Sequence, residues 1–348
     1  MSRMLLPFSV TAMVLGSGAF ADVPNVATDI APVHSLVARV MEGVGAPNLI
    51  VQSGASPHEY SLRPSEAAAL QNANLVFWIG KDLTPWMDDA LRTLATNATV
   101  TTLLETDETK RLEFREGALF EAHDHSDHDE EEHDGHEDHD DHDHGEAKTD
   151  EHDHEEDGHD DHGEEDHAGH DDHEGHDHGA HDPHAWLSLE NANAWVNVIA
   201  GKLSAEDPDN AGTYFANAAA ARAEMQALSA EINATLDPVR GGSFIVFHDA
   251  YQYFEDDFDL PAAGAISVSD ASDPSPARIA EIQGRIRAEG IDCVLAEPQF
   301  NTGLIATVLD GVDARTGVID PLGAELAPGA GLYPQLIRNM ANTLAECL

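Results

Sequence analysis

The chain has 348 residues and a formal net charge of −49 at pH 7, from 66 Asp and Glu against 17 Lys and Arg. It lacks the basic patch that would neutralise phosphates, so nucleic-acid binding is excluded, and an anionic membrane surface would repel it. The sequence also holds 22 His, so cations are the ligands that this composition favours.

Residues 1–21 have the pattern of a secretory signal peptide. Arg3 is their only charge, an apolar run extends from Met4 to Leu15, and the segment ends in the small-x-small sequence Ala19-Phe20-Ala21. The apolar run is too short to span a membrane. We therefore expect an exported chain that begins near Asp22; the alternative is an N-terminal anchor helix.

Short apolar runs alternate with helical patterns along most of the remaining chain, which predicts an α/β fold with parallel sheets, in two domains of ordinary size. The predicted strands are Leu49–Val51, Leu75–Ile79, Phe244–Phe247, Ala265–Val268, Cys293–Ala296 and Gly317–Ile319. The predicted helices are Val33–Glu42, Ser65–Gln71, Trp86–Ala95, Pro276–Glu289, Gly303–Leu309 and Tyr333–Glu346.

A longer helix is predicted over residues 208–236. Asp207 suits the N-cap, Pro208 suits the first helical position, and the helix ends at Asp237-Pro238. At ~1.5 Å per residue it would reach ~43 Å, which suits a strut between two lobes. This prediction places an N-terminal lobe at 22–207 and a C-terminal lobe at 237–348.

Residues 121–182 hold 18 of the 22 His and 30 of the 66 acidic residues. With almost no apolar side chains to bury, the segment is expected to be a disordered loop. Neutral imidazoles beside carboxylates bind transition metals, whereas a solvated acidic spacer would need only charge. The predicted low-affinity metal ligands are His123, His125, His128, His133, His136, His139, His142, His144, His152, His154, His159, His162, His167, His170, His173, His176, His178 and His181.

Only four His lie outside that segment, and three of them stand at the ends of predicted elements. His58 follows the strand that ends at Val51, His248 directly follows Phe244–Phe247, and His184 lies at the start of a helix. Since ligands of open α/β sheets bind beyond the carboxyl ends of strands, these imidazoles are expected to face one cleft.

Three imidazoles plus at most one carboxylate describe a four-coordinate site that Zn²⁺ favours, whereas Mn²⁺ and Mg²⁺ prefer more oxygen ligands. Asp320 follows the predicted strand Gly317–Ile319 and could supply the carboxylate, or it could initiate a turn before Pro321. His34 lies in an amphipathic pattern and is expected to be packed or exposed rather than a ligand.

Known catalytic motifs are absent from the sequence. It has no His-Glu-x-x-His, no Gly-x-Ser-x-Gly, no phosphate-binding Gly loop and no Cys nucleophile motif, so we expect no enzymatic activity. A zinc hydrolase with Glu59 as general base is the alternative, but nothing else in the chain completes such a site.

The only two cysteines are Cys293 and Cys347. In an exported protein, a lone pair of this kind is expected to form a disulfide. The bridge would close a loop of about 55 residues and add ~4 kcal/mol in the chain-entropy model. The alternative is two buried thiols.

Four motifs surround the candidate ligands. The stretch from Gly54 to Ser65 reads GASPHEYSLRPS, and DPHAWL at 182–187, HDAY at 248–251 and DPLG at 320–323 follow it. In this order they resemble the periplasmic zinc-binding proteins of ABC importers, the ZnuA type, within the metal-binding solute-binding family. The His-rich acidic segment and the cysteine pair match the zinc branch.

The resemblance implies two lobes, each around a four-stranded parallel sheet, joined by one rigid helix. It implies that His58, His184 and His248 bind Zn²⁺. Asp320 falls where manganese relatives have a carboxylate ligand, a place that water can take in zinc members. Manganese relatives carry Glu at the position of His248, which favours zinc here.

The implied function is high-affinity capture of Zn²⁺ in the periplasm and its delivery to the membrane permease of an ABC importer with its ATPase. We expect the protein to act as a monomer. The alternatives are a manganese or broad divalent-metal receptor and a stand-alone periplasmic zinc buffer.

Overall fold

The structure is a computed structural model that describes residues 23–115, 120, 181–267, 274–300 and 302–348. The predicted signal peptide and the His-rich segment up to residue 180 lie outside these residues. Within the described part of the chain, no helix is both long and apolar enough to cross a bilayer.

The first sheet has the strand order β2-β1-β3-β4, with every pairing parallel. Its strands are β1 (Val26–Thr28), β2 (Asn48–Leu49), β3 (Leu75–Trp78) and β4 (Thr99–Thr102). Helices α1 (Ala31–Val40), α2 (Pro64–Gln71) and α3 (Pro85–Leu94) connect them. Each of these helices has proline in its first turn, where the missing N–H needs no partner.

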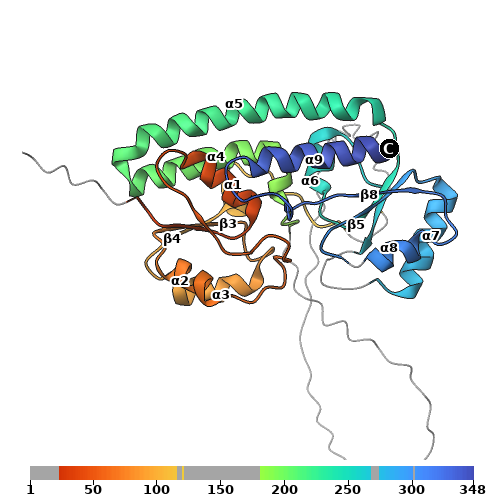
Figure 1. Cartoon of the computed structure of the whole chain (residues 1–348), viewed down its shortest axis with the longest axis horizontal. Helices are drawn as coiled ribbons and strands as arrows, with labels where there is room; N and C mark the ends of the chain where they lie inside the picture. The colour runs from red at the N-terminus through yellow and green to blue at the C-terminus, as the bar shows by residue number, and fades with distance from the viewer. Residues whose placement is uncertain (1–22, 116–119, 121–180, 268–273, 301) are drawn as a thin grey trace, which may run out of the picture. The chain divides into compact units, whose positions relative to one another are not determined.

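Both faces of this sheet are covered by helices (Figure 1). Because side chains alternate along a strand, Phe77 joins the apolar cluster on the α1 side. Its neighbour Val76 joins the opposite cluster, with Leu70 of α2 and Leu91 of α3. Burial on both sides explains why β3 reads as an uninterrupted apolar run.

The second sheet repeats this plan with the order β6-β5-β7-β8, again all parallel. Its strands are β5 (Phe244–His248), β6 (Gly264–Ser267), β7 (Cys293–Ala296) and β8 (Arg315–Val318). Its helices are α6 (Gln252–Phe258), α7 (Pro276–Glu289), α8 (Thr302–Val308) and α9 (Leu332–Cys347). The predicted fold class, two parallel four-stranded sheets flanked by helices, is confirmed.

Two long helices lie between the sheets in the sequence, α4 (Leu189–Glu206) and α5 (Ala211–Leu236). The predicted helix over 208–236 is confirmed from Ala211 onward, whereas Pro208–Asn210 form a 3₁₀ turn, a common opening of a helix. The Asp207 carboxylate accepts hydrogen bonds from Asn210 Nδ2 and Tyr214 Oη, which fixes this entry.

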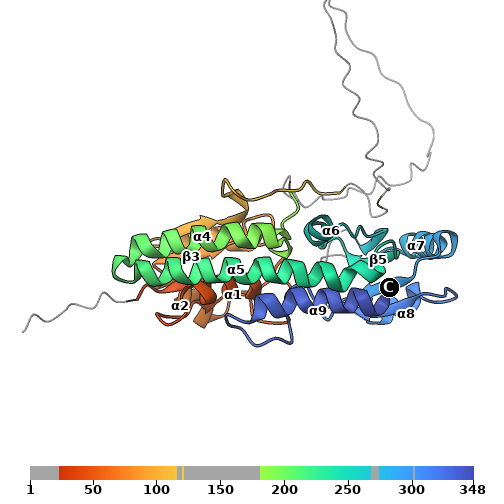
Figure 2. The same ribbon diagram turned by 90° about the horizontal axis from the view of Figure 1, so that it is seen from above.

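Helix α5 contacts α1, α4 and α9, and Figure 2 shows it running alongside α4 and α9. Its buried residues recur every three or four positions: Tyr214, Ala218, Ala221, Met225, Leu228, Ile232 and Leu236. These side chains belong to one continuous core that also contains residues of both sheets, among them Phe77 and Val246. The lobe boundaries at 207 and 237 stay a prediction.

A disulfide joins Cys293 of β7 to Cys347 at the end of α9, with the two Cα atoms 5.7 Å apart. Gly317 in the neighbouring strand β8 allows this helix to approach, because a Cβ there would lie 3.0 Å from Thr343 Cγ2 and 3.1 Å from Leu295 Cδ2. The bridge thus ties the last helix to the second sheet.

Replacing both cysteines by alanine should lower the free energy of unfolding by about 4 kcal/mol, the loop-closure contribution for the 54-residue separation. Urea denaturation with and without reductant measures this. Reductant should destabilise the unaltered protein and leave the double variant unchanged. Equal free energies of unfolding for the unaltered protein and the double variant, both measured without reductant, would contradict the expectation.

Candidate metal centre

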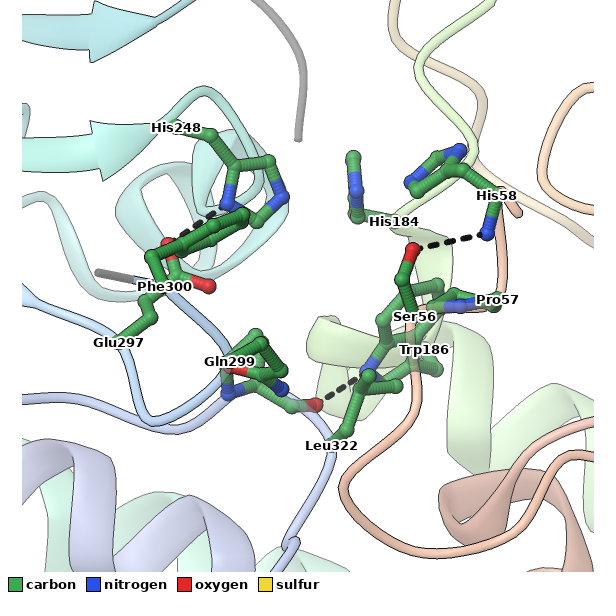
Figure 3. A pocket seen from close by; sticks show the side chains of 11 residues that line it. Ser56, Pro57, His58, His184, Trp186, His248, Glu297, Gln299, Phe300 and Leu322 are labelled. Atoms are coloured by element: carbon green, nitrogen blue, oxygen red, sulfur yellow. Dashed lines mark hydrogen bonds and ion pairs between the residues drawn. The ribbon is translucent and has the colours of Figure 1, made fainter. Parts of the chain in front are cut away.

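Three imidazoles that are distant in sequence converge in the structure. His58 lies in the loop after β2, His184 precedes the 3₁₀ turn Ala185–Leu187 that leads into α4, and His248 is the last residue of β5. One nitrogen from each ring lies within 4.8 Å of the others. The ring centroids of His58 and His248 are 5.6 and 5.3 Å from that of His184 (Figure 3).

This spacing suits a single small ion. With Zn–N bonds of about 2.1 Å, two nitrogens of a tetrahedral zinc ion lie about 3.4 Å apart. Side-chain shifts of about an ångström would bring the three nitrogens from their present separation to that distance. All three donors are imidazoles, a set that suits zinc, copper or nickel better than oxygen-preferring cations.

Buried carboxylates orient two of the three rings. Nδ1 of His184 lies 2.7 Å from Asp182 Oδ1, and Nδ1 of His248 lies 2.6 Å from Glu297 Oε1. Asp182 is 1% exposed and Glu297 3% exposed. When Nδ1–H donates to the carboxylate, Nε2 is the ring nitrogen left to bind a metal.

Sequence reasoning gave no role to either carboxylate. Asp182 was noticed only as part of the motif around His184. Glu297 directly follows the buried strand β7, at the same sheet edge as His248. The rule that places ligands beyond the carboxyl ends of strands applies to Glu297 as well as to the histidines.

The loop that carries His58 is fixed by neighbours on two helices. Trp86 of α3 donates its indole N–H to Pro57 O at 2.8 Å, and Tyr60 Oη donates to Glu66 Oε1 of α2 at 2.9 Å. The His58 backbone N–H donates to Ser56 Oγ at 3.2 Å. The adjacent Glu59 is exposed and lies outside the group of converging ligand atoms, which gives no support to a hydrolase base there.

Asp320 has a different arrangement in this structure. Its oxygens accept three backbone hydrogen bonds, from the N–H groups of Leu322 (3.0 Å), Gly323 (2.9 Å) and Ala324 (2.6 Å). The structure therefore uses Asp320 to hold a turn and does not bring it into the group formed by the three imidazoles. Its role as a metal ligand stays a prediction.

His34, the remaining histidine outside the acidic segment, is buried in α1 and its Nε2 lies 3.2 Å from Pro47 O. It is not part of the converging group. This agrees with the expectation that His34 is packed rather than a ligand.

A cavity of about 20 Å³ adjoins the three imidazoles. Its polar lining includes Glu297 and Gln299, and its apolar lining comes mainly from Pro57, Trp186, Phe300, Pro321 and Leu322 (Figure 3). Trp186 donates its indole N–H to Pro321 O at 2.8 Å, which ties two of these walls together. Apolar neighbours of this kind lower the local dielectric and strengthen electrostatic attraction to a cation.

The described residues on either side of the acidic segment meet next to this centre. The Asp182 N–H donates to Leu112 O at 2.9 Å, and Glu113 pairs with His181 in an antiparallel bridge. Tyr253 Oη donates to Asp182 O at 2.9 Å. Of the predicted low-affinity ligands His181 alone is described, as a half-buried residue of this bridge; the others, His123 to His178, lie outside the described residues.

A buried ion cluster lies beside the same junction. Arg115 pairs with Asp249, the residue after His248, and with Glu255 of α6. Burial alone would lower the pKa of Arg115, but hydrogen bonds to Glu255 and Asp249 raise it. Burial raises the pKa of the Asp182 carboxyl to about 7, opposed by the His184 backbone N–H and by the charge of Arg115.

Comparisons with known proteins agree with the fold and with the motifs. The family model described as "Zinc-uptake complex component A periplasmic" matches residues 26–347. A high-affinity zinc uptake system protein ZnuA of Brucella abortus is 48% identical over 333 residues, which is 96% of this chain and 94% of the relative. The Paracoccus denitrificans protein of the same name is 46% identical over 99% of both chains.

Solved structures share the fold. A crystal structure of ZnuA superposes with a TM-score of 0.67 at 19% identity, covering 94% of this chain and 99% of the other. The solute-binding protein FpvC of Pseudomonas aeruginosa, in complex with Mn²⁺, gives a TM-score of 0.69 at 16% identity, covering 93% of this chain and 98% of the other. With the family model matching almost the whole chain, the protein belongs to the periplasmic zinc-uptake component A family.

Proposed function

We propose that this protein captures Zn²⁺ in the periplasm and delivers it to the membrane permease of an ABC importer, which is driven by its ATPase. The observation that carries the proposal is the convergence of His58, His184 and His248 beside a small cavity, with two of the rings held by buried carboxylates. Membership of the zinc-uptake family supports the same function. The protein acts as a receptor and catalyses no reaction.

Zinc is the favoured ion because all three converging donors are nitrogen atoms. Manganese prefers oxygen ligands and a higher coordination number. The Mn²⁺ complex of FpvC shares the fold of this chain, but at 16% identity it does not bear on the choice of ion.

The proposal also assigns roles to the N-terminal residues and to the His-rich acidic segment. Residues 1–21 direct export and are removed. The His-rich acidic segment binds further ions weakly and buffers the supply to the central site. The contact at its C-terminal end supports this role, because the carboxylate of Asp182, the last residue of the segment, lies against His184.

Calorimetric titration of metal-free protein tests whether the central site binds zinc tightly and the His-rich segment binds it weakly. We expect deletion of residues 122–177, a cut that spares both Arg115 and Asp182, to leave one tight zinc site per chain and to remove the weaker sites. Loss of the tight site from a folded deletion variant would overturn the proposal, since the tight ligands all lie outside the deleted residues.

Competition on the same deletion variant decides between metals. Zn²⁺ should displace Mn²⁺ completely at equal concentrations, and the reverse exchange should not occur. Displacement of bound zinc by equimolar manganese would instead support the alternative of a manganese or broad divalent-metal receptor.

A further inference from the structure

Gln299 has an unusual place in the wall of the central cavity. It lies three residues beyond the end of β7 and is among the side chains that line the cavity beside the three imidazoles (Figure 3). Both polar atoms of its side chain, Oε1 and Nε2, are buried and have no hydrogen-bond partner among the described residues. A buried amide without partners costs free energy, so this residue calls for an explanation.

A zinc ion bound by the three imidazoles would need a fourth ligand. Zn²⁺ takes four ligands, and the structure brings together three. The carboxylate that follows β8, Asp320, already accepts three backbone hydrogen bonds and holds a turn. Moving it onto the metal would break bonds that organise Pro321 and Leu322, two residues of the cavity wall.

The cavity beside the imidazoles has room for a small fourth ligand. A volume of about 20 Å³ is enough for one water molecule. A metal-bound water has two protons to donate, and an amide oxygen is a suitable acceptor for one of them.

From these observations we propose that Gln299 is a positioning residue that accepts a hydrogen bond from the water molecule completing the coordination of the bound metal. The inference rests on the proposed zinc site and specifies how its fourth position is filled. It also gives the amide oxygen of Gln299 a partner, which the described residues do not provide.

Cobalt substitution tests this role, because the visible absorption of Co²⁺ reports the number and type of its ligands. Gln299→Met keeps the length of the side chain and removes both the donor and the acceptor. Gln335→Met, at an exposed position of α9, is the matched control. The parent protein of this experiment is the chain from Asp22 onward that lacks residues 122–177.

We expect Gln299→Met to bind one Co²⁺ or Zn²⁺ per chain with about threefold to tenfold weaker affinity, the effect of one lost hydrogen bond, and with an altered cobalt spectrum. Gln335→Met should match the parent protein in both measurements. Asp320→Asn, which keeps the Oδ1 acceptor of the turn, should leave the spectrum unchanged.

Two outcomes overturn the inference. One is a Gln299→Met protein whose affinity and spectrum equal those of the parent. The other is a spectral change confined to Asp320→Asn, which would make that carboxylate the fourth ligand. A parent protein that binds no ion tightly would instead refute the zinc site itself, so the two failures are distinguishable.

Discussion

Replacing His184 by alanine should abolish tight zinc binding. His184 is the central ring of the three, with both other imidazoles packed against it, and it is only 4% exposed. Loss of a carboxylate that merely orients a ligand costs about 10- to 100-fold in metal affinity, and loss of the ligand itself should exceed this range. Competition with a chromophoric chelator measures the affinity.

His34→Gln is the matched control for this prediction. His34 is also buried, in α1, but it lies outside the converging group. The control should bind zinc as the unaltered protein does. Equal zinc affinities for His184→Ala and the unaltered protein, with both shown to be folded by circular dichroism, would refute the three-histidine centre.

A large expected effect on stability also comes from the single substitution Arg115→Met. The guanidinium forms paired hydrogen bonds with both Asp249 and Glu255, whose side chains are only 3% and 5% exposed. Its removal leaves two buried carboxylates without their counter-charge. Breaking a buried ion cluster in this way should lower the free energy of unfolding by about 3–5 kcal/mol.

Urea denaturation compares this variant with Arg338→Met, which breaks the exposed pair between Arg338 and Glu231. The exposed pair should contribute much less, because solvent screens the attraction between its charges. Adding Asp249→Asn and Glu255→Gln to Arg115→Met should recover part of the lost stability, because no buried charge is then left unpaired. Similar losses from the two single Arg variants would show that burial of the cluster has no special cost.

The sequence predicted much of the second sheet because its strands are short apolar runs with clear ends. Cys293–Ala296 was predicted with the bounds that the structure has. The structure adds β1 and β4, which sequence patterns did not reveal. β1 has only three residues, and β4 is the Thr-rich edge strand Thr99–Thr102, whose first two residues are exposed. Such strands lack the apolar run on which the prediction depends.

Three further elements differ from the sequence prediction. A helix was expected to start at His184, but a 3₁₀ turn comes first and α4 begins after Ser188, whose Oγ accepts from the Asn191 N–H. His248 was placed after its strand and is in fact the last residue of β5. Helix α6 has seven residues and was not predicted, since so short an element gives little periodicity.

The candidate ligands were predictable because histidine is rare outside the acidic segment, and the topology brings strand ends of both sheets to one place. The carboxylates that orient the rings were not found, because acidic residues are common in this chain. Only the fold shows which of them are buried. Asp182 and Glu297 are distinguished by burial and by their contacts with His184 and His248, two properties that composition does not reveal.

The bridge between Glu113 and His181 brings two backbone positions that are far apart in the sequence next to each other, beside Asp182. An insertion at such a point can change length without displacing either sheet, and for a flexible insert each doubling of length costs only about 0.6 kcal/mol in closure entropy. The same geometry offers protein engineers a grafting point: a fluorescent reporter inserted there would end beside the residue that orients His184, which suits the construction of a zinc sensor.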